Sequence, residues 1–199
     1  MNTPLQVYFI RHGETEWSRS GRHTSHTDLP LTPKGEAMAR QLSEALKNIE
    51  FTQVWTSPRV RASSTCELAG LTQAQIEVDL VEWNYGDFEG LRSSEILLLQ
   101  PEWNLWEHGS PGGESPAQVA ARADALITRL LSCTGKVALF SHGHFGRALA
   151  ARWIGLALRA GQHFALDPAS ISILGFEAHH PQTRVIRLWN ASASGEARI

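Results

Sequence analysis

Val7-Tyr8-Phe9-Ile10-Arg11-His12-Gly13 and Val137-Ala138-Leu139-Phe140-Ser141-His142-Gly143 lie far apart in the sequence but end in the same way. In each stretch an apolar run leads into a histidine and then a glycine, which is typical of a buried strand followed by a loop. Ligands of open α/β sheets bind at the carboxyl ends of the strands, so parallel neighbours of this kind would place His12 and His142 at one rim of a site. The glycines would let the backbone turn sharply there and approach a ligand closely.

The rest of the chain alternates between short apolar stretches and longer amphipathic ones. Further strands are expected at 54–56, 76–78, 171–176 and 183–189. Helices are expected after Thr32-Pro33, Ser57-Pro58 and Ser115-Pro116, where a residue that can cap the first turn precedes a proline. This alternation predicts an α/β fold, a three-layer α/β/α sandwich with a mostly parallel central sheet. Residues 1–199 suit a single domain, with a small cap insertion at about 83–114, where glycines and aromatic residues gather.

Composition excludes several classes of function. The chain is 42% apolar and 19% charged with a net charge of −2, so overall charge would not draw it to nucleic acid or to acidic membranes. No stretch approaches the roughly 18 apolar residues of a membrane span and no signal peptide is visible, so we expect a cytoplasmic protein. Cys66 and Cys133 are expected to be reduced thiols. Trp153 and Trp189 could belong to the core or to the interface of a homodimer, and the sequence leaves both open.

Two arginines accompany the two histidines. Arg11 precedes His12, and Arg59 follows the expected strand 54–56 at the start of a helix, whose N-terminus itself attracts anions. Because the planar arginine fork matches phosphate oxygens, these groups together predict a site for a phosphate ester. Taken singly, each histidine would more often be a structural side chain, and Arg59 an ordinary exposed cation. The repetition at two strand ends favours the shared site.

Glu82 is the candidate proton donor, in the stretch Val81-Glu82-Trp83-Asn84-Tyr85-Gly86. Aromatic neighbours would reduce the hydration of its carboxyl, which favours the protonated form that a general acid needs. The alternative is an exposed glutamate without a role in chemistry, and the residues alone do not separate the two.

The motifs quoted so far resemble the phosphoglycerate-mutase-like branch of the histidine phosphatase superfamily. The resemblance extends in order over nearly the whole chain, through the segments 11–15, 27–35, 57–62, 82–90 and 141–143. Its length makes it far more specific than the single Arg-His-Gly tripeptide at the start.

The resemblance implies roles for individual residues. His12 would be the nucleophile and Glu82 the proton donor, while Arg11, Arg59 and a protonated His142 would hold the phosphoryl oxygens. Further contacts to phosphate or substrate are expected from Gly13, Thr15, Ser18, Thr24, Ser25, Tyr85, Gly143 and His144. Ser18 stands where much of the branch has asparagine, although a hydroxyl can still donate a hydrogen bond.

Within the superfamily, the segments 82–90, 103–109 and 142–144 look most similar to sedoheptulose-1,7-bisphosphatases. The cap after Gly90 is short and lacks the paired basic residues with which mutases hold a phosphoglycerate carboxylate, which favours a phosphatase. We therefore expect a metal-independent phosphatase that hydrolyses a small phosphate monoester, such as a sugar phosphate or bisphosphate, through a phosphohistidine on His12. Its partner would be a small phosphorylated metabolite, and no metal or other cofactor is expected.

Three other interpretations remain. A phosphoglycerate mutase, or a phosphatase that acts on a phosphoglycerate conjugate, would use the same residues. A metal hydrolase could use His142-x-His144, although the carboxylates usual near such a pair and a His-Glu-x-x-His motif are missing. A non-catalytic phosphate-binding module could share the fold, but it would not need the full set of catalytic groups that this sequence retains.

Overall fold

A six-stranded sheet forms the centre of the computed structural model, which describes residues 4–193. Residues 1–3 and 194–199 of the predicted domain lie outside this description. In spatial order the strands are β3 (Gln75–Ile76), β2 (Gln53–Thr56), β4 (Lys136–Ser141), β1 (Gln6–Arg11), β5 (Ser170–Phe176) and β6 (Arg184–Ser192). The first four run parallel, and β5 and β6 are each antiparallel to the strand before them. The predicted α/β fold with a mostly parallel sheet is confirmed.

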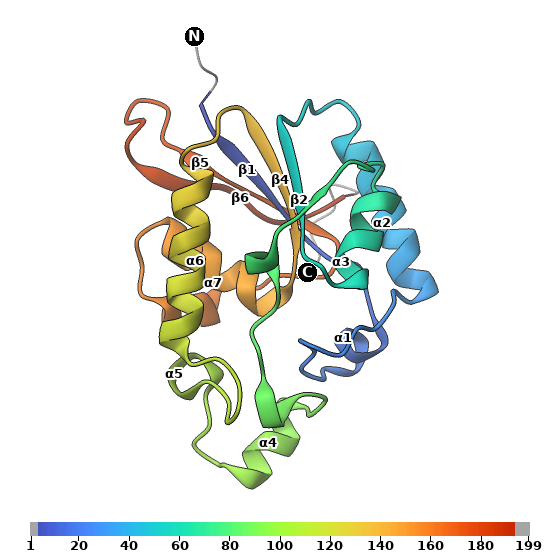
Figure 1. Cartoon of the computed structure of the whole chain (residues 1–199), viewed down its shortest axis with the longest axis vertical. Helices are drawn as coiled ribbons and strands as arrows, with labels where there is room; N and C mark the ends of the chain where they lie inside the picture. Colours follow the sequence, from blue (N-terminus) through green and yellow to red (C-terminus); the bar gives the residue numbers. More distant parts are fainter. Residues whose placement is uncertain (1–3, 194–199) are drawn as a thin grey trace.

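Helices cover both faces of the sheet (Figure 1). They are α2 (Pro33–Leu46) and α3 (Val60–Leu68) on one face, and α6 (Pro116–Leu130) and α7 (Gly143–Trp153) on the other. Side chains alternate along β1, so Val7 and Phe9 join the buried cluster of α6 and α7, whereas Tyr8 and Ile10 join that of α2. Burial on both faces explains why this strand is apolar at successive positions.

Helix α2 begins directly against the loop that follows β1. Thr32 caps the helix by accepting the N–H of Gly35 at 3.0 Å, as the sequence predicts. A Cβ at Gly35 would lie 2.1 Å from the carbonyl oxygen of Glu14, and one at Gly13 would lie 2.5 Å from that of Gly35. The two backbones therefore touch with no side chain between them, which only glycine allows.

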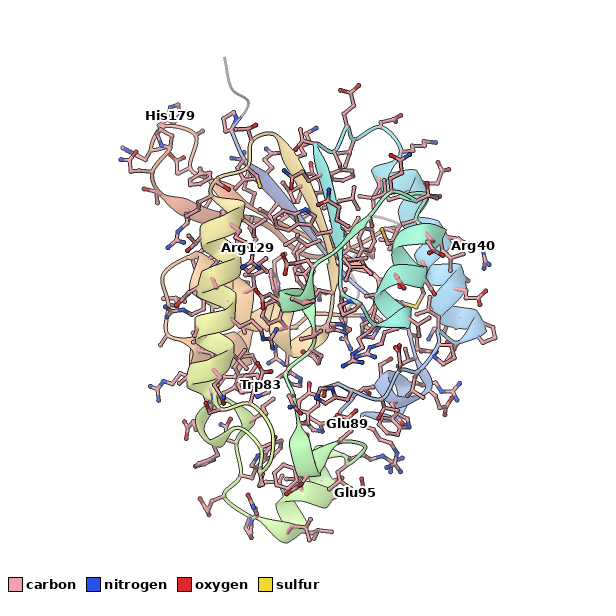
Figure 2. All side chains as sticks on the ribbon, viewed as in Figure 1. Arg40, Trp83, Glu89, Glu95, Arg129 and His179 are labelled. Atoms are coloured by element: carbon pink, nitrogen blue, oxygen red, sulfur yellow. The ribbon has the colours of Figure 1, made fainter. Side chains whose placement is uncertain are left out.

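The stretch between η1 (Val78–Leu80) and α6 lies beyond the carboxyl ends of the parallel strands (Figure 1). Its short helices are η2 (Gly86–Phe88), α4 (Ser93–Leu99) and α5 (Leu105–His108). Trp83 and Trp106 are buried and pack edge to face with ring centroids 5.5 Å apart, so both belong to the core of this segment. Figure 2 shows Trp83, Glu89 and Glu95 toward this end of the molecule, and His179 at the opposite end.

Two local predictions are wrong. Helix α3 begins at Val60 without a Ser57 cap, because the Ser57 hydroxyl faces His142 and the Asp28 carboxylate accepts the N–H of Val60 at 2.9 Å. The predicted strand 76–78 is shorter and shifted: β3 ends at Ile76, and the next residues turn into η1 at the exposed edge of the sheet.

The structure also shows where the two tryptophans lie that the sequence could assign to the core or to an interface. Trp153 is fully buried, and its Nε1–H donates to the carbonyls of Gly175 and Val185, so it is a core residue. Trp189 is half-buried and packs against Phe164, with ring centroids 5.5 Å apart. None of the helices in residues 4–193 combines the length and the apolar character that a membrane span requires.

Candidate active site

The two His-Gly strand ends lie side by side. β1 and β4 pair in parallel register with Arg11 opposite Ser141, and the N–H of His12 donates to the carbonyl of Ser141 at 2.9 Å. The rings of His12 and His142 stand edge to face, with centroids 5.2 Å apart. The repeated motif thus places both imidazoles together at the carboxyl ends of two neighbouring central strands, as the strand pattern predicts.

The partners of His12 define which nitrogen can react. Nδ1 lies 2.7 Å from the carbonyl oxygen of Gly13, and because a carbonyl only accepts hydrogen bonds, Nδ1 carries the proton. Nε2 therefore holds a lone pair, has no protein partner and is not sealed from solvent. Burial, followed by the positive charges of Arg61 and Arg11, holds the pKa of His12 well below its ordinary value. The imidazole is neutral near neutral pH, as a nucleophile must be.

His142 is neutral as well, which contradicts the expectation of a protonated His142. Its Nδ1 accepts the Nε–H of Arg61 at 3.2 Å, so its proton is on Nε2, 2.8 Å from the Ser57 hydroxyl. Burial and then the charge of Arg61 hold the pKa of His142 well below the ordinary value. In the phosphate-free protein His142 carries no charge, and its Nε2–H donates to the Ser57 hydroxyl.

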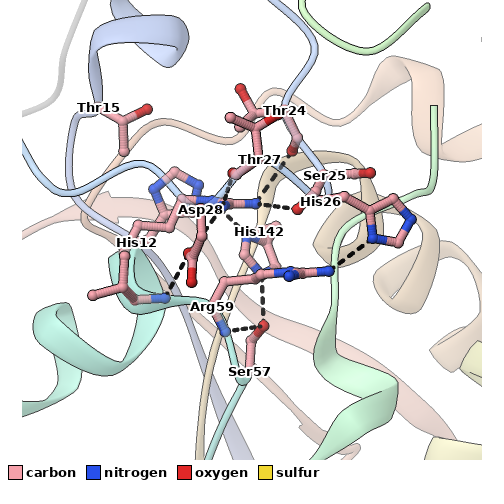
Figure 3. Close-up of polar contacts among 12 residues, drawn as sticks. His12, Thr15, Thr24, Ser25, His26, Thr27, Asp28, Ser57, Arg59 and His142 are labelled. Atoms are coloured by element: carbon pink, nitrogen blue, oxygen red, sulfur yellow. Dashed lines mark hydrogen bonds and ion pairs between the residues drawn. The ribbon is translucent and has the colours of Figure 1, made fainter. Parts of the chain in front are cut away.

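Arg61 has the central position that the sequence interpretation assigned to Arg59. Its guanidinium is fully buried and donates to the carbonyls of Thr24, Ser25 and Thr27, each at 3.2 Å, in addition to His142. Arg59 is half-buried and reaches His26 Nδ1 at 2.8 Å (Figure 3). The helix period was the missed signal: Arg61 stands one turn before Thr65, which accepts the N–H of Gly13 at 3.0 Å.

Arg11 and Glu82 face the same pocket from different elements. The Nη1 of Arg11 donates to the carbonyl of Leu166, and its Nε is buried without a protein partner. A Cβ at Gly143 would lie 3.2 Å from Cζ of Arg11, so glycine leaves room for the guanidinium. Glu82 lies at the N-terminus of α7, where its carboxylate accepts the N–H groups of His144 at 3.0 Å and Phe145 at 2.7 Å, besides that of Trp83. These N–H groups hold its carboxylate rigidly.

A pocket of about 190 Å³ opens in front of His12. It is lined by Arg11, His12, Ser18, Gly21, Arg22, His23, Thr24, Glu82, Tyr85, Ser93, Gly143, His144, Arg147 and Leu166. Arg22, His23 and Arg147 were not identified from the sequence, because they lie outside the two repeated strand ends.

Among the described residues 4–193, no group of three or more His, Cys, Asp or Glu side chains is arranged to hold a metal ion.

Three of the residues expected to touch phosphate support the site from behind the pocket wall. Gly13 contacts Thr65 and Gly35, as described above. Thr15 is fully buried and caps α1 (Glu16–Ser20) by accepting the N–H of Ser18 at 3.1 Å. The N–H of Ser25 donates to the carboxylate of Glu89, and its hydroxyl is buried without a partner. Figure 3 shows Ser25 beside Thr24 and Thr27 in the loop above His142.

The histidines of the site make stability depend on pH. Burial is the largest cause that holds the pKa values of His12, His23, His142 and His144 below the ordinary value. In the unfolded chain these imidazoles take up protons below about pH 6.5, which the folded protein resists. The free energy of unfolding should therefore fall as the pH drops below that value, by up to about 1.4 kcal/mol per pH unit for each histidine. Urea unfolding at about pH 7.5 and about pH 5.5 measures this, and equal midpoints would contradict it.

Comparison with known proteins supports what the geometry indicates. The family model "Histidine phosphatase superfamily (branch 1)" matches residues 7–191. The chain is 42% identical over 187 residues to an acid phosphatase of Mycobacterium tuberculosis, with 92% of each chain covered. It is 37% identical over 183 residues to a sedoheptulose 1,7-bisphosphatase of Saccharomyces cerevisiae, with 75% of this chain and 68% of that protein covered.

The fold is shared as well. A solved structure of an open reading frame product from Mycobacterium tuberculosis superposes with a TM-score of 0.87 at 40% identity, with 94% of this chain and 98% of that chain covered. The family match over almost the whole chain, and relatives at these identities, show that this protein belongs to the histidine phosphatase superfamily and is a phosphatase.

Proposed function

We propose that this phosphatase hydrolyses small sugar phosphates or bisphosphates through a covalent phosphohistidine on His12, without a metal ion. The observation that carries the proposal is the state of His12: a neutral imidazole with Nδ1–H held by a carbonyl and with Nε2 free at the wall of a cationic pocket. A free lone pair beside arginine charges is what attack on a phosphate ester requires.

In the first step, the lone pair of His12 Nε2 attacks phosphorus, an N–P bond forms, and the bond to the ester oxygen breaks. The hydrogen bond from Nδ1 to the Gly13 carbonyl supports the positive charge that the ring acquires. Arg11 and Arg61 lie close enough to lower the pKa of His12. The same positive charges would stabilise the negative charge on the phosphoryl oxygens. Water then cleaves the N–P bond and regenerates His12.

Glu82 supplies the proton transfers in this proposal. Its carboxylate is fixed by three backbone N–H groups and lines the same pocket as His12. In its protonated form Glu82 donates a proton to the departing alcohol, and the resulting carboxylate then accepts a proton from the attacking water.

The pocket supports a polar organic leaving group. Arg22, His23, His144 and Arg147 line it together with the nucleophile, so its wall offers hydrogen-bonding groups to such a leaving group. One relative is named for a sugar bisphosphate, the yeast sedoheptulose 1,7-bisphosphatase. Sugar phosphates combine an anion with many hydroxyls, and they match both parts of this pocket.

A hydrolysis screen tests the proposed substrate class. Sugar monophosphates and bisphosphates, simple alkyl phosphates and phosphoglycerates would be incubated with a strong chelator, and released phosphate measured. We expect release from sugar phosphates that the chelator does not reduce. A parallel isomerisation assay on phosphoglycerate separates the mutase: isomerisation without phosphate release would contradict the proposal, and so would loss of activity on chelation.

Glu82→Gln tests the proton transfers. The amide has nearly the same shape but cannot cycle a proton, so kcat should fall by about 10² to 10⁴-fold while inorganic phosphate still binds. Glu177→Gln is a matched control, since the Glu177 carboxylate also accepts backbone N–H groups, those of His179 at 2.7 Å and His180 at 3.0 Å, but does not line the pocket. Equal rates for Glu82→Gln and the wild type would remove Glu82 from the mechanism.

We propose the cytoplasm as the site of this activity. Cys66 and Cys133 are free thiols, and burial raises the pKa of Cys66 to about 12. A buried, protonated thiol suits a compartment in which thiols stay reduced. Fractionation of cells that express the tagged chain tests this, and recovery outside the cytosolic fraction would contradict it.

A further inference from the structure

A second pair of histidines stands on the pocket wall, and phosphoryl transfer as described above does not use it. His23 follows α1, and His144 lies in the first turn of α7. Their rings are stacked nearly parallel, with centroids 5.9 Å apart and an interplanar angle of 6°. Aromatic rings fix both from the side: Trp103 lies 5.6 Å from His23, and Trp106 lies 5.7 Å from His144. The orientation of both imidazoles is therefore set before a substrate arrives.

Tyr85 determines which nitrogen of His144 carries the proton. The Tyr85 hydroxyl lies 2.7 Å from His144 Nδ1 and has no other protein partner. If His144 were the donor, the hydroxyl proton of the nearly buried Tyr85 would have no acceptor, which costs about 1–3 kcal/mol. Tyr85 therefore donates to Nδ1, and His144 carries its proton on Nε2. Burial raises the pKa of Tyr85 well above its usual value, so this donor persists over the working pH range.

His23 presents the opposite group. Its Nδ1 lies 2.9 Å from the carbonyl oxygen of Leu91, so Nδ1 carries the proton and Nε2 carries the lone pair. The Nε2 atoms of His23 and His144 have no partner among the described residues, and neither is among the atoms sealed from solvent. The pocket wall therefore presents one donor, on His144, and one acceptor, on His23. Burial keeps the pKa of both imidazoles low, so this pattern holds at neutral pH.

Glu82 places this pair on the leaving-group side of the pocket. Its carboxylate accepts the backbone N–H of His144 at 3.0 Å. The carboxyl group of the proposed proton donor therefore lies next to the residue that carries the His144 imidazole. The ester oxygen must reach Glu82 in order to be protonated. The carbon atoms that follow this oxygen then lie next to His144 and His23.

We propose that His144 and His23 recognise hydroxyl groups of the leaving alcohol and thereby select polyol phosphates over alkyl phosphates, with Tyr85 as the positioning residue. This inference rests on the proposed function. A hydroxyl both donates and accepts, so it can complement the donor of His144 and the acceptor of His23 together. An alkyl chain in the same place leaves both unpaired, and sites built to bind a hydroxyl discriminate strongly against analogues that lack it.

The test compares two esters of equal carbon number, ribose 5-phosphate and n-pentyl phosphate, by the ratio of their kcat/KM values. For the wild type we expect a preference for ribose 5-phosphate of at least about tenfold. Tyr85→Phe deletes one hydroxyl and should reduce this preference by about fivefold or more, because Nδ1 of His144 then competes for the proton. Tyr8→Phe is the matched control: it deletes the hydroxyl of the other tyrosine, which packs against α2 and should retain the preference.

Two substitutions of His144 sharpen the result. Glutamine can carry an amide N–H to the position of Nε2, whereas asparagine reaches only that of Nδ1, so His144→Gln should keep more of the preference than His144→Asn. An unaltered preference in both Tyr85→Phe and His144→Asn would overturn the inference while the proposed function stands, as would a wild type that hydrolyses the two esters equally well. A wild type that releases no phosphate from ribose 5-phosphate or from any other sugar phosphate would overturn the proposed function, and this inference with it.

Discussion

His12→Ala is expected to lower kcat by at least about 10³-fold and to abolish the acid-labile phosphoenzyme. The reason is that Nε2 of His12 is a free lone pair at the pocket wall, whereas the lone pair of its neighbour His142, on Nδ1, is occupied by Arg61. His142 therefore cannot take over the attack. Rapid quenching with a radiolabelled phosphate ester, at alkaline pH where phosphohistidine survives, measures the intermediate.

The matched control for this experiment is His179→Ala. His179 is exposed on the loop between β5 and β6, at the opposite end of the molecule (Figure 2), and it is the backbone N–H of His179 that donates to the Glu177 carboxylate. Its replacement should leave both kcat and the labelled intermediate within twofold of wild type, roughly the scatter of such measurements. Label that persists in His12→Ala would refute the assignment of the nucleophile.

Arg61→Ala should lower kcat/KM by about 10² to 10³-fold, the range for loss of one preorganised group that stabilises charge. The same substitution should destabilise the fold, because three loop carbonyls and Nδ1 of His142 lose their donor. Each unsatisfied group costs about 1–3 kcal/mol, less where water enters. Arg61→Lys keeps the charge but cannot reproduce the four-way geometry, so it should recover stability better than activity.

Arg59→Ala provides the comparison, since both arginines come from the same short motif. Arg59 is half-buried and pairs with His26. Its loss removes one positive charge that acts on His142 and should therefore reduce kcat/KM by less than about tenfold. Steady-state kinetics and urea unfolding of the two alanine variants would rank them. A larger loss of activity for Arg59→Ala than for Arg61→Ala would contradict the central position of Arg61.

The fold followed from the sequence because its main signals are local. Apolar strands that are buried on both faces, and helix starts such as Thr32-Pro33, depend on neighbours within a few residues. Ser57 misled for the opposite reason. It has the form of a cap, but its hydroxyl contacts His142, which lies 85 residues further along the chain, and Asp28 supplies the acceptor for the helix. Long-range partners of this kind leave no local trace.

The site was predictable in part. The His-Gly repeat identified the two imidazoles because parallel strands bring equivalent positions together. The choice between Arg59 and Arg61 could not be made from spacing alone, since it depends on which side of the first turn of α3 faces His142. His23 and Arg147 carry no motif, and only the path of the loops brings them to the pocket. The charge state of His142 depends on burial, which sequence does not show.

The contact between Gly13 and Gly35 couples the nucleophile to a helix on the far side of the loop. Elsewhere a layer of side chains lies between backbone segments and can absorb small displacements by changing rotamers. Here the backbone of Gly35 in α2 touches the backbone of Gly13 and Glu14 directly. A displacement of α2 would therefore also move the loop whose Gly13 carbonyl orients the imidazole of His12. The accuracy with which Nε2 of His12 is oriented therefore depends on how rigidly α2 is held in place.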